Sequence, residues 1–575
     1  MIWTAWLVLA GTQVIRNVGD LSRFGTTLFQ ILAPLQLALA ILFSALLAAS
    51  AVAQEKDRRT LILLLLTNLS NCELVLGKLL AGMLNVLVLL TASLPVFMAC
   101  ALFGGVSFQQ IGRVFAVTLA SALACGSLGS TIALWREKTF QTLAWTVLAL
   151  VFWLAAGESL AHGLLGPGWH GISSEQWAAA VSPWQAILAA GRPLLETRAD
   201  LPYVGTPVNL FLLVSLGIAA LVNGVAILRV RVWNPSQEVR ASQPEDASRD
   251  SIWGEDYDAR QLLAARAGNQ SAPPPAVVSV HAAPGKTRQV WDNPILWREM
   301  RTWAYGRKIL VLRLAYWVLF GLAAAAIHSL AHSRLGIRVN TAALVLVPLF
   351  VLSLVLVNAQ AVTALTTERD LGALDLLLVT DVTAKEFVFG KLGGILYNTK
   401  EMVLLPMALC VYLWCARALS AENLCYLVGG LACMNAFVAM LGVHTGMAYT
   451  NSRSAIGVSL GTLFFLFIGI ATCMRMMIAF SGSFTVQLQP FLAFMGGGWL
   501  GLFLALGARN PSPAIGLAAF FCPFITFYAI TSFWLGHTLS VFLVLVFAYG
   551  FATTAMLIPA IYEFDVATGR TTAEE

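Results

Sequence analysis

The sequence predicts an all-α polytopic membrane protein made of two six-helix transmembrane halves. Of its 575 residues 58% are apolar and only 11% are charged, which leaves too few charges for the surface of a soluble protein. Runs of about 20 apolar residues, enough to cross a hydrocarbon core of roughly 30 Å, recur along almost the whole chain. In addition, one charged, leucine-rich segment occurs twice, which indicates two related halves.

The predicted spans follow the apolar runs in order. In the first half we expect them at residues 2–14, 28–53, 79–103, 111–134, 140–163 and 207–229. In the second half we expect them at residues 309–330, 340–366, 393–416, 424–449, 456–480 and 539–561. Two shorter runs, 490–507 and 514–531, contain Gly-Gly-Gly or proline; they are either re-entrant or horizontal helices or, if both cross, raise the count to fourteen.

A long polar stretch separates the halves. We therefore divide the chain into a first half (1–229), a flexible linker (230–290) and a second half (291–575). Seven of the eight lysines fall on one predicted face, and short cytoplasmic loops are enriched in Lys and Arg. We expect that face, with the linker and the C-terminus, to be cytoplasmic in a multi-pass protein of the cell (inner) membrane.

Charge and cysteine usage exclude several function classes. The net charge of +6 is spread over loops, which fits contact with a lipid bilayer rather than with nucleic acid. The nine cysteines stand alone, mostly in apolar runs and without a C-x-x-C pair, so the sequence predicts no disulfide framework and no metal site. No cluster of His, Asp, Glu or Ser at useful spacing indicates an enzyme, and we expect no cofactor.

The repeated segment reads EKDRRTLILLLLTNLSNCELVLGKL at residues 55–79 and ERDLGALDLLLVTDVTAKEFVFGKL at residues 368–392. A constant offset of 313 aligns the two copies without a gap and gives 12 identities in 25 positions. Because the matches include charged residues and glycine, chance similarity between leucine-rich segments does not explain them. The chain is therefore predicted to be an internal duplication.

Each copy is predicted to contain a charged helix end, an apolar helix too short to cross, and a new helix start. Ser70 with Glu73, and Thr383 with Glu386, have the spacing of capping boxes. The Gly-Lys pairs at 77–78 and 390–391 then mark re-entry into the bilayer, with each lysine expected to reach the headgroups. The short apolar helix between them needs a protein partner outside the bilayer.

This pattern resembles the cytoplasmic segment between the second and third membrane helices of type-2 ABC-transporter permeases, the ABC export permeases. The resemblance implies that the short helices are coupling helices, which dock on separate ATP-binding subunits. It assigns the acidic residue at each helix end to Glu55 and Glu368. It assigns the docking helices to residues 61–66 and 374–379, with the contacts carried by Leu61, Leu63, Leu64, Leu66, Leu374, Leu376, Leu377 and Val379. The first copy departs from the family at Arg59, where the second copy has Gly372 and the family usually has glycine.

Residues 291–308 predict a helix on the membrane surface, similar to the elbow helix of the same family. Asn293 can cap this helix and Pro294 suits its first turn. At 100° per residue, Leu296, Met300 and Trp303 share one face, and Arg298 and Arg301 point the opposite way. The first half lacks an equivalent elbow, and we expect either that the true start lies upstream of Met1 or that this half does without one.

The resemblance implies a permease subunit of an ATP-driven exporter that moves an unknown substrate. The sequence contains no G-x-x-x-x-G-K-[ST], so ATP hydrolysis is expected in a separate ABC ATP-binding subunit. Two alternatives stay open: a secondary active transporter with two six-helix repeats, and a membrane scaffold that no longer transports.

Polar residues inside predicted spans are candidates for a substrate pathway. Asn85 and Asn398 occupy equivalent positions of the repeat, and Lys400 and Glu401 follow in the same predicted span. These four residues could line a substrate route, or they could form a hydrogen-bond or ion-pair network between helices.

Overall fold

A computed structural model of the chain describes residues 18–161, 168–169, 172–192, 206–234, 291–301, 309–332, 339–378, 380–479, 484–508 and 511–567. The predicted span at 2–14 and nearly all of the predicted linker lie outside the described residues. The chain divides into two units, one made of Met1–Asn234 with Asn293–Glu575 and the other of Pro235–Asp292.

Helices make up almost all of the described first half. They are α2 (Val18–Asp57), α3 (Thr60–Leu66), α4 (Asn71–Leu102), α5 (Phe108–Trp135), α6 (Thr139–Ala161), α7 (Ser174–Val181), α8 (Pro183–Gly191) and α9 (Pro207–Trp233). Two-residue strands, β1 (Gly168–Trp169) and β2 (Ile172–Ser173), pair antiparallel between α6 and α7.

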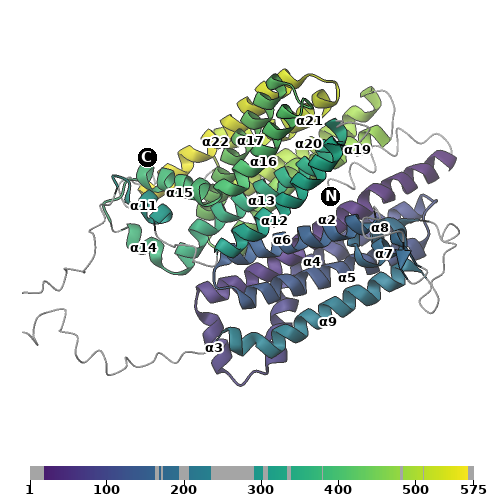
Figure 1. Cartoon of the computed structure of the whole chain (residues 1–575), viewed down its shortest axis with the longest axis horizontal. Helices are drawn as coiled ribbons and strands as arrows, with labels where there is room; N and C mark the ends of the chain where they lie inside the picture. Colours follow the sequence, from purple (N-terminus) through teal and green to yellow (C-terminus); the bar gives the residue numbers. More distant parts are fainter. Residues whose placement is uncertain are drawn as a thin grey trace, which may run out of the picture. The chain divides into compact units, whose positions relative to one another are not determined.

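The described second half is built in the same way but with more long helices. They are α11 (Pro294–Arg301), α12 (Ile309–Ala331), α13 (Val339–Asp370), α14 (Ala373–Leu378), α15 (Ala384–Asn398), α16 (Lys400–Cys415), α17 (Ala421–Ala448), α18 (Ser452–Phe464), the π-helix η3 (Phe465–Gly469), α19 (Ile470–Ala479), α20 (Phe484–Leu506), α21 (Pro513–Trp534) and α22 (Thr538–Ala567). Figure 1 shows the helices of residues 18–234, in purple to blue, gathered in one bundle, and those from α12 onward gathered in another.

Twelve helices of the described residues are long and apolar enough to cross a membrane, which confirms the all-α polytopic class. They include α20 and α21. The structure therefore favours the expectation that residues 490–507 and 514–531 both cross the membrane over the expectation that they form re-entrant or horizontal helices. Proline and glycine do not end these helices: Pro490 and Pro523 lie inside them, and Gly498 gives room to the ring of Phe465.

The predicted span at 393–416 is not continuous. Its helix is interrupted at Thr399, where α15 ends and α16 begins, and neither piece alone is counted among the twelve. The prediction of one unbroken span here was therefore wrong.

The offset of 313 extends far beyond the repeated loop. The last residues of α2 and α13, Asp57 and Asp370, are separated by this offset, and so are the first residues of α4 and α15, of α5 and α17, and of α6 and α18. The N-caps of α5 and α17, Ser107 and Ser420, obey it as well, and both side chains accept a hydrogen bond from a first-turn amide. The duplication therefore covers at least α2, α4, α5 and α6 of the first half and α13, α15, α17 and α18 of the second.

Equivalent glycines let the long helix of each half approach its neighbour. Gly129 of α5 faces the carbonyl of Ala45 in α2, and Gly442 of α17 faces the carbonyl of Asn358 in α13. A Cβ at Gly442 would lie 2.9 Å from that oxygen, which is closer than real Cβ atoms come. All four residues obey the same offset, so the same close helix pair forms the centre of each half.

The halves share a hydrophobic core. The long helix of each half packs on the other half, α2 against α18 and α19, and α13 against α6. One cluster of buried residues accordingly contains Val52 and Leu143 of the first half together with Leu356 and Ile456 of the second. Both halves therefore fold as parts of one compact body.

The elbow segment forms helix α11, and the residues by which it packs on the protein were not predicted from the sequence. Asn293 caps the helix by accepting a hydrogen bond from the Leu296 amide at 2.9 Å. The buried positions are Ile295 and Glu299, not Leu296 and Met300, while Trp303 lies outside the described residues. The reason is that α11 packs on the glycine-rich face of α15 at residues 390–394.

The equivalent glycines Gly390 and Gly77 give a matched test of this contact. A Cβ at Gly390 would lie 2.8 Å from Asn293 Oδ1 and 2.9 Å from Ile295 Cβ, whereas no described atom lies within 4 Å of a Cβ at Gly77. We expect Gly77→Ala to raise stability by up to about 1 kcal/mol, because Ala loses less entropy in a helix. Gly390→Ala should lower it by about 1–3 kcal/mol through overpacking. Apparent melting temperatures in detergent check this, and an increase for both variants would contradict the α11–α15 contact.

Candidate functional site

The two repeated loops begin with the same turn. After α2 the chain turns at Arg59 with φ 60°, and after α13 it turns at Gly372 with φ 70°. This left-handed conformation suits glycine and is uncommon for other residues. The substitution of arginine for glycine in the first copy therefore leaves the shape of the turn unchanged.

The two loops also end alike, in capping boxes. The Ser70 hydroxyl accepts a hydrogen bond from the Glu73 amide at 3.3 Å, and the Glu73 carboxylate accepts one from the Ser70 amide at 2.9 Å. Thr383 and Glu386 make the same pair of bonds at 3.2 and 2.9 Å. Each short helix is thus fixed at both ends by local backbone geometry.

Helix α3 is half buried and half exposed. Leu61 and Leu65 are buried in the core shared by the halves, and Leu64 packs against it. Leu63 and Leu66 are 64% and 63% exposed. The helix therefore presents large apolar side chains beyond the charged end of α2.

In the second copy, Leu374 and Leu377 of α14 are half buried against the core of the second half. The side chain of Leu376 and the whole of Val379 lie outside the described residues.

Arg231, at the end of α9, holds α3 in place. Its guanidinium donates to the carbonyls of Leu65 at 3.1 Å and Leu69 at 3.2 Å, and to Asn71 Oδ1 at 2.8 Å. These bonds satisfy carbonyls at the C-terminal end of α3, where a cation is favoured. Arg231 was not among the predicted site residues, and its signal in the sequence is the arginine pair at 229 and 231, at the end of an apolar span.

Both Gly-Lys lysines pair with acidic residues, and the burial of Lys391 shows that the prediction of a lysine reaching the headgroups was wrong for the second copy. Lys78 pairs with Glu55 in the first half, and Lys391 pairs with Glu368 at 2.7 Å in the second. Both pairs obey the offset of 313. Lys391 is only 1% exposed, while Lys78 is 26% exposed. The acidic residue at the end of the long helix thereby ties it to the helix that follows the loop.

The elbow helix adds two charges to the second of these pairs. Arg298 pairs with Glu368 and, at 3.2 Å, with Glu299, and Glu299 also pairs with Lys391 at 2.7 Å. We call these four residues the elbow charge cluster. Burial works to lower the pKa of Arg298, but attraction to Glu368 and Glu299 outweighs it and raises that pKa above its ordinary value. Arg298 therefore lies on the side of α11 that meets α13 and α15, a pairing that the sequence analysis did not predict.

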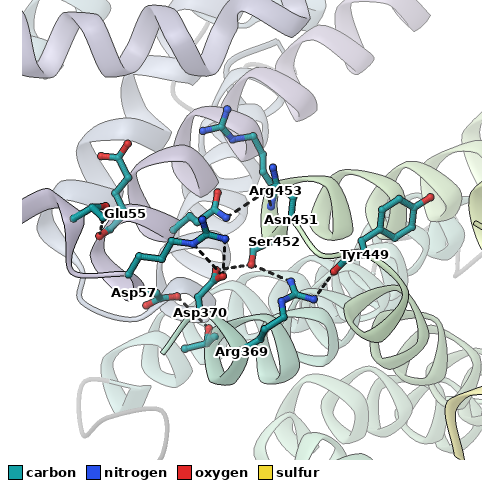
Figure 2. A network of polar contacts seen from close by, with 12 residues as sticks. Glu55, Asp57, Arg369, Asp370, Tyr449, Asn451, Ser452 and Arg453 are labelled. Atoms are coloured by element: carbon teal, nitrogen blue, oxygen red, sulfur yellow. Dashed lines mark hydrogen bonds and ion pairs between the residues drawn. The ribbon is translucent and has the colours of Figure 1, made fainter. Parts of the chain in front are cut away.

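Polar residues from both halves meet at the end of the bundle that carries the loops (Figure 2). Arg58 binds Asp370 at 3.1 Å, and Thr367 donates to Asp57 at 3.3 Å. Gln54 donates to Asn451 at 3.3 Å. We call these six residues the inter-half cluster, and they join the last turns of α2 and α13.

Within each half, the same carboxylates bind the next helix start. Thr139, the first residue of α6, donates to Asp57, and Ser452, the first residue of α18, donates to Asp370. Both pairs obey the offset of 313. Each aspartate therefore joins three helices, two of its own half and one of the other.

The four candidate pathway residues do not come together. Asn85 lies on the exposed face of α4. Asn398 donates to the Glu299 carbonyl at 3.3 Å, and Arg313 of α12 pairs with Glu401 at 3.3 Å. The Lys400 ammonium lies 4.3 Å from the ring centre of Tyr397. Three of the four thus lie around the helix break at Thr399.

The fold and its repeated loops define a multi-pass membrane protein with two related halves. Residues 18–169 match the family model of the ABC-2 family transporter protein, a stretch that contains α2, the first loop and α3. No curated protein and no solved structure matches the chain. The family match confirms, for this part of the first half, the resemblance to type-2 ABC-transporter permeases and supports a transport-permease role.

The equivalent lysines test how much each buried pair contributes. We expect Lys391→Met to cost about 3 kcal/mol, because it leaves two buried carboxylates with one cation. Lys78→Met should cost at most about 1 kcal/mol, because that pair is partly exposed. Unfolding in detergent measures both, and Glu299→Gln should recover much of the Lys391→Met loss by restoring charge balance. Equal losses for the two lysines would contradict this account.

A double-mutant cycle tests the contact between the halves. Arg58→Gln and Asp370→Asn should show a coupling energy of about 1–2 kcal/mol, as expected for a hydrogen-bonded charge pair that is half exposed on one side. Arg59→Gln with Asp370→Asn is the control, and its coupling should stay below about 0.5 kcal/mol. If the coupling between Arg58 and Asp370 were no larger than the coupling in this control, the inter-half pair would not form in solution.

Proposed function

We propose that the chain is the membrane permease of an ATP-driven exporter, and that α3 and α14 are coupling helices that dock on separate ATP-binding subunits. The observation that carries this proposal is the pair of exposed leucines on α3, Leu63 and Leu66. Large apolar side chains outside the spans are costly in water unless another protein covers them. On this proposal the loops, the linker and the C-terminus are cytoplasmic.

The contacts of α3 suit the transmission of force. The turn at Arg59 joins it to α2, Arg231 joins it to α9, and Glu55 with Lys78 joins α2 to α4. A push on α3 by a partner would therefore move three long helices together. In the second half, the elbow charge cluster joins α11, α13 and α15 in a similar way.

The inter-half cluster lies where such a movement would separate the halves. Its contacts are a few hydrogen bonds and one ion pair, and Arg58 is 47% exposed. The Asp370 carboxylate is only 3% exposed, so separating the halves would expose it to water in place of its bond to Arg58. A partner that changes shape on binding ATP could therefore shift the balance between a closed and an open arrangement of this end.

We assign a structural role to Asn398, Lys400 and Glu401, at the helix break. Arg313 donates to the Asn398 carbonyl at 3.2 Å and also binds Glu401, so one cation of α12 spans both sides of the break. This arrangement supports the network alternative more than the substrate-route alternative.

The test replaces the exposed leucines by charge. Leu63→Asp with Leu66→Asp should reduce both the co-purified ATP-binding subunit and ATP-dependent export by about tenfold or more, because a charge in an apolar pocket is not compensated. Stability should change little, since both side chains are exposed. Leu63→Met with Leu66→Met is the control and should retain both activities.

Other outcomes identify the alternatives. Uptake driven by an ion gradient in vesicles without ATP would favour the secondary transporter. An ATP-binding subunit that is retained without any ATP-dependent movement of substrate would favour the scaffold.

A further inference from the structure

The two docking surfaces carry opposite charge. We define the first surface as α3 with residues 58–73 and the end of α9, and the second as α14 with residues 371–386 and the end of α22. The repeat makes residues 58–73 and 371–386 equivalent, so side-chain differences between these loops are differences between two copies of one segment, while the ends of α9 and α22 are not related by the offset of 313.

The first surface is basic. Apart from Arg58, which is paired with Asp370, it carries Arg59, Arg229 and Arg231 against one carboxylate, Glu73. Arg59 and Arg229 are exposed, and the bonds of Arg231 to α3 show that the end of α9 lies beside the short helix. Arg59 directly precedes α3, and Arg231 binds the C-terminal end of α3, so both ends of the short helix carry a cation.

The second surface is acidic. Its sequence carries one lysine, Lys385, against five carboxylates: Asp375, Asp381, Glu386, Glu563 and Asp565. The end of α22 lies beside the start of α15, because Phe564 stacks on Phe387 with ring centres 4.6 Å apart. The nearest arginine of the elbow, Arg298, is already paired with Glu368 and Glu299.

The difference extends into the short helices themselves. Position 62 of α3 is isoleucine, while its equivalent in α14 is Asp375. Arg58 and Arg59 are replaced by Leu371 and Gly372. No position of the first loop between residues 60 and 72 is charged, so its charge comes from the arginines around it.

Two identical subunits related by a two-fold axis present the same pocket twice. A pocket with an acidic rim would attract the first surface and repel the second, and a basic rim would do the reverse. We propose that this permease binds two non-identical ATP-binding domains, one with an acidic rim for α3 and one with a basic rim for α14. This inference rests on the proposed function.

Photo-crosslinking from equivalent positions tests it. Thr67 and Thr380 obey the offset of 313 and are both exposed, so a benzophenone amino acid at either position should not disturb the fold. The full chain is expressed in cells of the source organism, irradiated in intact membranes, and the crosslinked peptides are identified by mass spectrometry. We expect each position to capture a different ATP-binding domain, with about tenfold preference over the other.

Charge reversal provides the second arm. Arg59→Glu with Arg229→Glu should reduce capture at Thr67 by about tenfold and leave capture at Thr380 unchanged. The matched control is Arg59→Lys with Arg229→Lys, which keeps the charge and should keep the capture. Asp375→Lys with Asp381→Lys should reduce capture at Thr380 by about tenfold and leave capture at Thr67 unchanged.

The outcomes separate the two proposals. Capture of the same peptides of one domain at both positions would overturn the inference and leave the proposed function standing, and capture of an ATP-binding domain at only one position would also overturn it. Failure of both positions to capture any ATP-binding domain, with the chain present in the membrane at normal amount, would overturn the proposed function as well.

Discussion

The structure depends on one ion pair that occurs twice, between the acidic residue at the end of each long helix and the lysine that follows each loop. Glu55 with Lys78, and Glu368 with Lys391, close each loop into a unit of fixed geometry. The short helix between them cannot move without the two long helices that the pair connects. Every larger contact of this end is arranged around that closure, including those of the elbow helix.

The same constraint explains how the halves differ. In the second half the pair is buried under α11, which brings one cation and one carboxylate and keeps the charges balanced. In the first half the pair is partly exposed, and α9 supplies the additional anchor through Arg231. The duplicated backbone has thus acquired different neighbours and different surface charge, while the ends of the long helices stay equivalent.

Much of the fold follows from the sequence. The long apolar runs, the offset of 313 and both capping boxes depend on composition and on spacing within a few residues, and they appear in the structure at the expected positions. The short helices between charged helix ends are of this kind too. Such features are local. The hydroxyl of an N-cap residue and the carboxylate three residues later lie within one helical turn, so each can bond the other residue's backbone amide.

What only the tertiary structure decided is the set of partners that lie far apart in the chain. A lysine near a helix start points to headgroups unless a carboxylate 23 residues earlier folds back to meet it, as Glu55 meets Lys78. The packed face of α11, the break at Thr399 beside Arg313, and the bonds of Arg231 have the same origin. Charged groups pair with the opposite charge that lies nearest in space. The distance between two charges depends on how the helices pack, and no local sequence pattern encodes that packing.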